Sequence, residues 1–315
     1  MKLVFAGTPQ VAVPSLTLLA SSGHEIAAVV TRTDAALGRK RVLTPSPVAA
    51  AAERLGLPVI KANRLDADAT AAITALDADL GVIVAYGGLV REPLLSAPRL
   101  GWINLHFSLL PRWRGAAPVQ RAIMAGDPTT GAAVFRLVAE LDAGAVFAQL
   151  STPIGQDTTA GGLLDELSLS GAELLRGVVD GLAAGTLEAV EQSGEVTLAP
   201  KLSLTDARVD WTLPAERIHA IIRGVTPEPG AFTEIAGARL KLLAVSRIHD
   251  TPTPDSDTQN SPGLSAGQIS EIDKRVLIGT GTEPLELITV QPAGKTPMKA
   301  IDWWRGVAAT EVVAS

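Results

Sequence analysis

Runs of apolar residues in the first 150 positions alternate between two kinds of spacing. Short runs rich in β-branched residues predict strands, several of them buried on both faces of a sheet. These runs lie at residues 2–6, 25–31, 57–60, 79–85 and 101–106. The segments between them are predicted to be helices, at residues 10–21, 47–56 and 66–76. Strands and helices in alternation predict a mostly parallel sheet with crossover helices.

The pattern changes after this alternating region. Residues 131–139 and 145–150 are predicted to form a pair of strands, and residues 159–184 to contain a helix rich in Leu, Ala and Gly. From 188 to 206 the composition becomes more polar, which predicts an ordered linker. The expected N-terminal domain therefore covers 1–187 and is α/β, with a Rossmann-like sheet.

The C-terminal part, 207–315, has the pattern of a small β domain. Strand-like runs separated by Gly and Pro predict a β-barrel of OB-like type. These runs lie at residues 231–235, 239–246, 275–279 and 285–292. Residues 250–264 lack apolar content and are predicted to be a disordered loop.

Composition narrows the class of protein. The chain has 315 residues, and 47% of them are hydrophobic without one long apolar stretch, so a soluble protein of two domains is expected. It contains no cysteine, which excludes disulfides and thiolate metal sites. A strand-like segment directly at the N-terminus predicts no signal peptide, and a cytoplasmic location is expected. Metal-ligand spacings such as His-Glu-x-x-His are not found, so no metal is expected.

The net charge of −6 argues against binding nucleic acid through the whole surface. A local basic patch stands out at Gly38-Arg39-Lys40-Arg41, with Arg32 before it. Such a run is often an ordinary solvated loop. Here it joins a predicted strand to a predicted helix at the edge where open α/β sheets place their ligands.

Asn104 and His106 are the strongest candidates for chemistry. They are separated by one residue in a predicted strand, so their side chains project from the same face. Asp142 follows about forty residues later in the turn Leu-Asp-Ala-Gly. An amide donor, an imidazole and a carboxylate are the groups that acyl transfer to an amine requires. A structural histidine and an ordinary Asp-Gly turn fit the same pattern, so the pattern alone leaves both interpretations open.

A long motif starts at these residues. The sequence Asn-Leu-His-Phe-Ser-Leu-Leu-Pro-Arg-Trp-Arg-Gly-Ala-Ala-Pro-Val-Gln-Arg (104–121) closely resembles the signature of the methionyl-tRNA formyltransferases, within the wider formyltetrahydrofolate-dependent transferases. Shorter matches occur at 5–9, 44–48, 84–87, 141–144, 201–203 and 207–211. A weaker likeness continues to 303–306. The long motif is highly specific, whereas the C-terminal matches are weak.

The resemblance implies transfer of the formyl group of 10-formyltetrahydrofolate, as co-substrate, to the α-amino group of methionyl initiator tRNA. Asn104, His106 and Asp142 fall on the catalytic positions of the family. Asn104 would donate a hydrogen bond to the developing oxyanion. His106 would stabilise that oxygen or move the proton from the amine to the folate, and Asp142 would orient the imidazole and raise its pKa. Direct attack by the amine needs no covalent intermediate.

The resemblance also implies binding residues. The folate should lie near the stretches 80–89 and 138–144 and against the end of the motif. The expected folate-binding residues are Ser108, Leu109, Leu110, Pro111, Tyr86, Gly87, Leu89 and Val138. For tRNA, Arg39 matches a basic position of a family loop that contacts the acceptor stem, with Lys40, Arg41 and Lys201 as neighbouring candidates. Further candidates in the C-terminal domain are Arg239, Lys241, Lys295 and Lys299, although ordinary surface residues would look the same.

Three other functions remain to be separated. A sugar-nucleotide N-formyltransferase would share the fold, the cofactor and the catalytic residues, but the basic loop at 38–41 and Lys201-Leu-Ser favour tRNA. A hydrolase that releases formate is a weaker alternative. A non-catalytic RNA- or folate-binding protein would not need Asn104, His106 and Asp142 together. A monomer is expected. Gly88 departs from the larger apolar residue that is common in the family, which is expected to loosen the folate loop.

Overall fold

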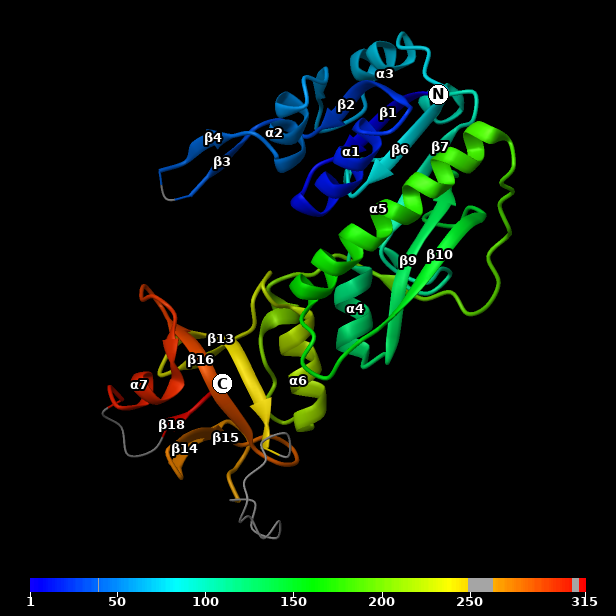
Figure 1. Cartoon of the computed structure of the whole chain (residues 1–315). Coiled ribbons are helices and arrows are strands. Elements are labelled where there is room, and N and C mark those ends of the chain that lie inside the picture. Colours follow the sequence, from blue (N-terminus) through cyan, green and yellow to red (C-terminus); the bar gives the residue numbers. More distant parts are fainter. Residues whose placement is uncertain (39, 249–262, 308–311) are drawn as a thin grey trace. The chain divides into compact units, whose positions relative to one another are not determined.

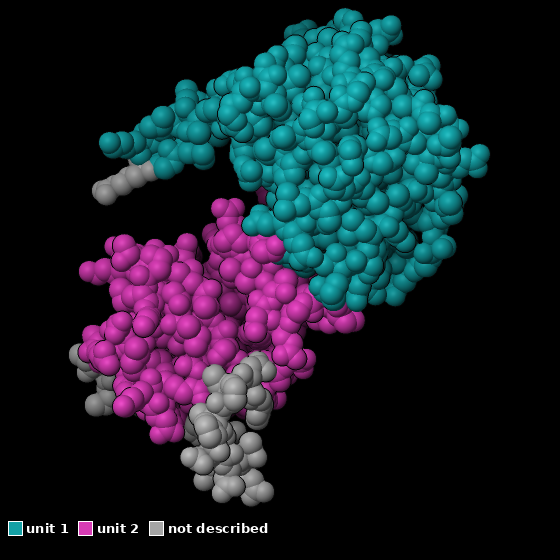
Figure 2. Space-filling view, viewed as in Figure 1, with its two compact units in different colours: residues 1–118, 129–153, 163–200 teal, residues 119–128, 154–162, 201–315 magenta. Residues whose placement is uncertain are grey.

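The computed structural model describes residues 1–38, 40–248, 263–307 and 312–315 (Figure 1). The chain divides into two compact units, shown in different colours in Figure 2. Unit 1 comprises residues 1–118, 129–153 and 163–200. Unit 2 comprises residues 119–128, 154–162 and 201–315. Two short segments from the first half of the sequence therefore belong to the C-terminal unit. The predicted boundaries at 187 and 207 stay a prediction.

Unit 1 is built on a seven-stranded sheet with the order β10-β9-β7-β6-β1-β2-β5. Its strands are β1 (Lys2–Gly7), β2 (Glu25–Thr31), β5 (Val59–Lys61), β6 (Leu80–Val84), β7 (Trp102–His106), β9 (Thr129–Arg136) and β10 (Val146–Pro153). The five earlier strands are parallel to one another, and β9 is antiparallel to both β7 and β10. The predicted Rossmann-like, mostly parallel sheet is confirmed.

Helices follow the strands of this unit, and all of them except a short turn at residues 94–96 fall within segments that the sequence predicts to be helical. They are η1 (Gln10–Ala12), α1 (Val13–Ala20), α2 (Pro47–Arg54), α3 (Ala67–Thr74), η2 (Leu94–Ser96) and α5 (Ala160–Ala184). Helices α2 and α3 each begin with a side-chain cap. The hydroxyl of Ser46 accepts a hydrogen bond from the Ala49 amide, and the Asp66 carboxylate accepts one from the Ala69 amide. Pro47 follows the cap of α2, where its missing N–H costs nothing.

The position of α5 determines which face of β7 is covered. A Cβ atom on Gly171 of α5 would lie 3.2 Å from the side chain of Leu105 and 3.5 Å from that of Phe107. Both of these residues are buried. Because side chains alternate along a strand, Asn104 and His106 project from the opposite face. The helix therefore packs on one face of β7 and leaves the other for the candidate chemistry.

Unit 2 contains a closed antiparallel sheet with the order β12-β13-β16-β15-β14-β18. Its strands are β12 (Phe232–Ile235), β13 (Ala238–Arg247), β14 (Gln268–Ile272), β15 (Arg275–Ile278), β16 (Leu285–Pro292), β17 (Met298–Lys299), which pairs with β16, and β18 (Val312–Val313). Backbone hydrogen bonds of 3.0 and 2.9 Å join Glu234 of β12 to Ser315, which follows β18. The first and last strands are thus linked, and the predicted β-barrel is confirmed.

The sequence analysis did not foresee several elements of this unit. They include α4 (Pro118–Ala125), η3 (Thr205–Ala207), α6 (Ala215–Gly224), α7 (Ala300–Trp304) and β14. Met124 of α4 belongs to the hydrophobic core of the barrel unit, together with Ile218 and Ile222 of α6. The loop predicted at 250–264 falls mainly on residues outside those that the structure describes.

The basic patch predicted as a loop lies on a short hairpin formed by β3 (Ala35–Leu37) and β4 (Val42–Thr44). A second small sheet pairs β8 (Arg114–Gly115) with β11 (Leu198–Ala199) of the predicted linker. Within the described ranges, no helix is both long and apolar enough to cross a lipid bilayer.

Candidate active site

Asn104 and His106 lie on β7, which pairs with the neighbouring strand β9. In the sheet register, Asn104 pairs with Phe135 and His106 with Ala133. The imidazole contacts the Phe135 ring edge-on, with 6.3 Å between the ring centroids and an interplanar angle of 86°. The expected placement of both side chains on one face is therefore consistent with their register and contacts.

The imidazole of His106 is held by a backbone carbonyl. Its Nε2 lies 2.8 Å from the Trp113 oxygen, and the ring is buried. A carbonyl oxygen can only accept a hydrogen bond, so Nε2 carries a proton. Burial lowers the pKa of His106, and the opposing effects of the Asp142 carboxylate and the Trp113 carbonyl do not offset it. The neutral ring therefore presents an unprotonated Nδ1.

Asp142 faces that nitrogen. Its Oδ2 lies 3.7 Å from Nδ1 of His106, and its side chain is 11% exposed. This distance is too long for a hydrogen bond, and both atoms are acceptors in the neutral state. The same Oδ2 accepts a 2.7 Å hydrogen bond from the Gly115 amide.

Of the two roles expected for Asp142, orienting the imidazole needs correction, whereas its effect on the pKa of His106 has the expected direction. Because Nδ1 has no proton to donate, the Trp113 carbonyl orients the ring in its place. Asp142 does raise the pKa of His106, as expected, but burial has the larger effect and the pKa is lowered. Trp113 could not be found from its side chain, because only its backbone oxygen takes part.

The turn that carries Asp142 is fastened from the predicted linker. Asp142 has the left-handed backbone conformation, with φ of +47°. The amide nitrogen of Gln192 donates hydrogen bonds of 2.8 Å to the carbonyls of Asp142 and Gly144. A Cβ on Gly144 would lie 1.8 Å from the Arg136 carbonyl, so only glycine fits. The sequence analysis missed Gln192, because its distance along the chain gave no signal.

Asn104 is half-buried, and its side chain makes no hydrogen bond with any residue that the structure describes. Its amide therefore keeps its donors for another molecule. Asn104, His106 and Asp142 all belong to unit 1. The site thus contains three functional groups: a side-chain amide with free donors among the described residues, an imidazole with an unprotonated nitrogen, and a carboxylate.

The segment after β7 supports the site mainly through its packing. Ser108 is fully buried, and its hydroxyl donates a 2.6 Å hydrogen bond to the Arg112 carbonyl. Leu110 is buried against Ala133 and Phe135. Leu109 is half-buried and Pro111 is buried.

The other expected folate-binding residues lie after β6 and β9. The Tyr86 ring is buried in the core, and its hydroxyl donates a 2.6 Å hydrogen bond to the Ala62 carbonyl, so its ring points away from solvent. Gly87 has φ of +77°, and its carbonyl accepts a 2.6 Å hydrogen bond from Arg32. Leu89 is 67% exposed, and Val138 is half-buried.

Gly88 has a structural reason in this chain. A Cβ at this position would lie 2.5 Å from the Tyr86 ring. The ring is fixed in the core, so a larger residue does not fit beside it in this conformation.

Most of the expected tRNA-binding residues are exposed to solvent. Arg39 lies outside the described residues. Lys40 and Arg41 are exposed at the end of the β3–β4 hairpin, and Lys201 is also exposed. In unit 2, Arg239, Lys295 and Lys299 are exposed, whereas Lys241 is half-buried. The Arg239 guanidinium stacks over the Phe232 ring at 4.0 Å.

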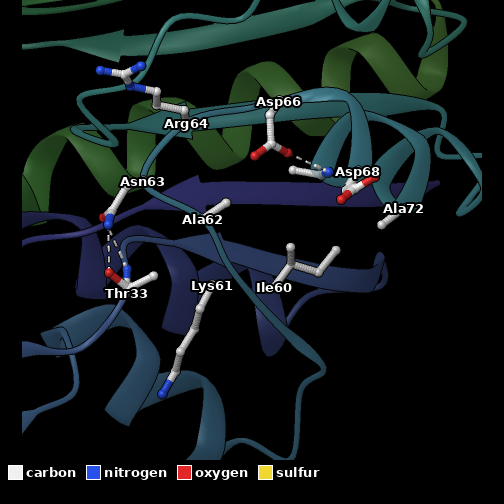
Figure 3. A pocket seen from close by; sticks show the side chains of 10 residues that line it. Thr33, Ile60, Lys61, Ala62, Asn63, Arg64, Asp66, Asp68 and Ala72 are labelled. Atoms are coloured by element: carbon white, nitrogen blue, oxygen red, sulfur yellow. Dashed lines mark hydrogen bonds between the residues drawn. The ribbon is translucent and has the colours of Figure 1, made fainter.

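A cavity of about 580 Å³ lies at the other side of the sheet, beside β5 and α3 (Figure 3). Its lining includes Thr33 and Asn63, which are joined by a 2.7 Å side-chain hydrogen bond. Three strands separate β5 from β7 in the sheet order, so this cavity is distinct from the site around His106. In the described part of the chain, no cluster of three or more His, Asp or Glu side chains could hold a metal ion.

Comparison with known proteins places the site in a family. The family described as "Formyl transferase" matches residues 1–179, and "Formyl transferase, C-terminal domain" matches 201–308. A methionyl-tRNA formyltransferase of Clavibacter sepedonicus is 60% identical over 314 residues, covering 100% of both chains. The chain belongs to the methionyl-tRNA formyltransferases. Another member of this family, from Acidothermus cellulolyticus, is 51% identical over 97% of each chain.

Solved structures show the same fold at low identity. An N-formyltransferase of Helicobacter canadensis, in complex with folinic acid and dTDP-3-aminofucose, has a TM-score of 0.66 and 17% identity over 93% of this chain and 99% of its own. HypX of Aquifex aeolicus in complex with tetrahydrofolic acid has a TM-score of 0.59 and 16% identity, covering 96% of this chain and 46% of that one. At this low sequence identity, the solved structures show only that the fold is shared. Membership of the family is shown by the relatives of higher identity.

Proposed function

We propose that this protein transfers the formyl group of 10-formyltetrahydrofolate to the α-amino group of methionyl initiator tRNA, in translation initiation. The observation that carries this proposal is the 60% identity, over the full length of both chains, to a methionyl-tRNA formyltransferase. The site around His106 supplies groups suited to that reaction.

The proposed mechanism is direct attack of the amine on the formyl carbon. His106 accepts a proton from the attacking amine at Nδ1, and the Asp142 carboxylate 3.7 Å away stabilises the imidazolium that results. Asn104 donates a hydrogen bond to the formyl oxygen as it gains negative charge, an interaction worth about 3–4 kcal/mol in related acyl-transfer sites. His106 then returns its proton to N10 of the folate as the carbon–nitrogen bond to N10 breaks. A new N-formyl bond forms, and tetrahydrofolate leaves.

The protonation of the His106 ring supports a role for Nδ1 as a general base, in preference to a role as a donor that stabilises the oxyanion. The proton on Nε2 is engaged by the Trp113 carbonyl, and Nδ1 has none to donate while the ring is neutral. The donors of the Asn104 amide have no partner among the residues that the structure describes. In the proposed mechanism, the Asn104 amide therefore stabilises the formyl oxygen, and the His106 imidazole transfers the proton.

Folate is proposed to lie against the carboxyl ends of β6 and β7. In this region Gly87 and Val138 offer backbone groups, and exposed Leu89 offers an apolar surface. Tyr86 contributes only its backbone, because its ring is in the core. Ser108, Leu109, Leu110 and Pro111 form the supporting wall. Two proteins of similar fold are named as complexes with tetrahydrofolic acid or folinic acid, which supports the proposed co-substrate.

Initiator tRNA is proposed to contact the β3–β4 hairpin through Arg39, Lys40 and Arg41, with Lys201 as a further contact. The charges of exposed lysine and arginine suit phosphate oxygens. The exposed apolar side chains of Leu37 and Leu43, at 57% and 72%, give the hairpin a mixed surface that a purely solvated loop does not need. The domains at 1–187 and 207–315 are proposed as the catalytic and the tRNA-binding domain.

The molecule that accepts the formyl group distinguishes this function from the main alternative, a sugar-nucleotide N-formyltransferase. The purified protein is incubated with labelled 10-formyltetrahydrofolate and either methionyl initiator tRNA or a dTDP-amino sugar, and label in each acceptor is counted. We expect label in the tRNA. The His106→Ala variant serves as the inactive control. Incorporation into the sugar alone would refute the proposal, and binding of tRNA without any formyl transfer would favour a non-catalytic protein.

A further inference from the structure

The segment between α5 and β11 reaches back to the residues proposed for catalysis. Gln192 is half-buried there, and its side-chain amide uses all of its hydrogen-bonding capacity. Its nitrogen donates to the carbonyls of Asp142 and Gly144, each at 2.8 Å. Its oxygen accepts hydrogen bonds of 2.6 and 3.2 Å from Nη2 and Nε of Arg114. These partners fix the orientation of the amide, since carbonyls need donors and a guanidinium needs an acceptor.

Through this amide, two separate loops are joined. One is the turn that carries Asp142, and the other is the strand β8 with Trp113 before it. The Trp113 carbonyl orients the His106 imidazole, and the Gly115 amide holds the Asp142 carboxylate. Among the described residues, the partners of the two side chains, the Trp113 carbonyl and the Gly115 amide, both lie on the second of the two loops that Gln192 connects.

The same linker holds the second loop at another point. The hydroxyl of Thr197 accepts a 2.9 Å hydrogen bond from the Trp113 amide, and its carbonyl accepts one of 2.9 Å from the Arg114 amide. This contact fixes the loop with Trp113 but not the turn with Asp142. Gln192 is thus the linker residue whose side chain spans both loops.

We propose that Gln192, paired with Arg114, is a positioning residue for the proposed formyl transfer: it sets the separation between Nδ1 of His106 and the Asp142 carboxylate. The proposal rests on the proposed function, because the distance between His106 and Asp142 matters only if these two residues take part in formyl transfer. Gln192 touches neither reactant in this role. It acts through the turn at Asp142, whose left-handed backbone depends on support from its surroundings.

The test replaces Gln192 by Met, which keeps the length and removes all four hydrogen bonds. We expect kcat for tRNA formylation to fall about ten- to hundredfold, with KM for tRNA and folate within about threefold, because small displacements of catalytic groups cost this much. Gln149→Met, the same change at an exposed glutamine of β10, serves as the matched control and is expected to keep native activity.

A second readout separates positioning from mere stabilisation of the fold. Among the described residues, Asp142 is the charged group that raises the pKa of His106. If the turn moves away, this effect is lost and the pKa falls further, so the acid limb of kcat moves to lower pH. The same shift is measured without substrate, by NMR titration of the His106 imidazole. This measurement stays informative even if the formyl assay with the native protein fails, which would refute the proposed function instead.

The outcomes are distinct. Reduced kcat together with a downward shift of the His106 titration supports the proposal. Native kcat, a loss confined to KM, or an unshifted titration in a folded Gln192→Met protein would overturn it. Should this variant fail to fold, Gln192→Glu replaces it, because a carboxylate keeps the partner of Arg114 but faces two carbonyls without donors. Native kcat in Gln192→Glu would equally contradict the proposal.

Discussion

At the scale of single residues, the chemistry of His106 follows from one backbone contact. The Trp113 carbonyl accepts a hydrogen bond from the protonated Nε2, and burial keeps the ring neutral, so Nδ1 is left as a base beside Asp142. A sequence pattern can place an imidazole on a strand, but it cannot say which nitrogen is protonated. That choice depends on a loop seven residues further along the chain.

This division between the two nitrogens predicts the effect of His106→Gln. The glutamine amide can replace Nε2 as the donor to Trp113 but supplies no base at the position of Nδ1. Single-turnover formylation is expected to slow by about 10²–10⁴-fold, the usual contribution of a general base. Binding of tRNA, measured by filter retention, should stay within a few-fold of native. If His106→Gln kept nearly native turnover, proton transfer through Nδ1 would be excluded.

At the scale of elements, the hairpin β3–β4 was predicted only as a basic loop between a strand and a helix. Its pairing of residues 35–37 with 42–44 gives the segment a defined edge, with Lys40 and Arg41 exposed near its tip. Apolar residues on both strands remain exposed, which hides the alternation that usually reveals a strand. The element therefore had no sequence signal beyond its charge.

The hairpin gives a prediction about salt dependence. If Arg41 contacts a tRNA phosphate, Arg41→Gln should weaken tRNA binding and reduce the slope of log K against log salt by about one. Arg176→Gln serves as the matched control, since Arg176 is an exposed arginine on α5 that pairs with Glu173. Affinities measured between low and moderate salt check the slope. Equal slopes in the Arg41 variant and the native protein would remove the hairpin from the interface.

Much of the N-terminal fold could be predicted because its strands are short, apolar and separated by helices. Strand β7 was expected at 101–106 and found at Trp102–His106, and the pair of strands after it was also found. The short elements around the site were not foreseen. Strands β8 and β11 have two residues each, and the hydrogen-bond partners of Gln192 lie 48 to 78 residues earlier in the chain. Neither hydrophobic spacing nor turn chemistry encodes such pairings.

At the scale of the whole molecule, the compact units do not follow the order of the sequence. Segment 119–128 lies in unit 2, where Arg121 forms a 2.9 Å ion pair with Asp206. Segment 154–162 also belongs there, and the Gly161 amide donates a 3.0 Å hydrogen bond to the Thr226 carbonyl. A division of the chain at one point therefore cuts through the core of unit 2, although the family matches divide it between 179 and 201.

This interleaving predicts how a fragment ending at residue 200 behaves. Such a fragment keeps α4 but loses the residues that bury Met124, including Ile218 and Ile222. Exposing a methionine of this kind costs about 1.5–3 kcal/mol, and the ion pair of Arg121 is lost as well. Thermal unfolding should show a lower Tm than the corresponding transition of the full chain, and Met124→Gln should improve the solubility of the fragment. An unchanged Tm would contradict the assignment of α4 to the core of unit 2.

The seam of the barrel has a consequence for handling the protein. Hydrogen bonds between Glu234 and Ser315 close the barrel, and β18 pairs with β14 just before that point. Trimming of these last residues by a carboxypeptidase would uncover backbone groups along β12 and β14 together. Exposed strand edges recruit other chains. Clipped preparations are therefore expected to self-associate even while the catalytic groups of unit 1 remain intact.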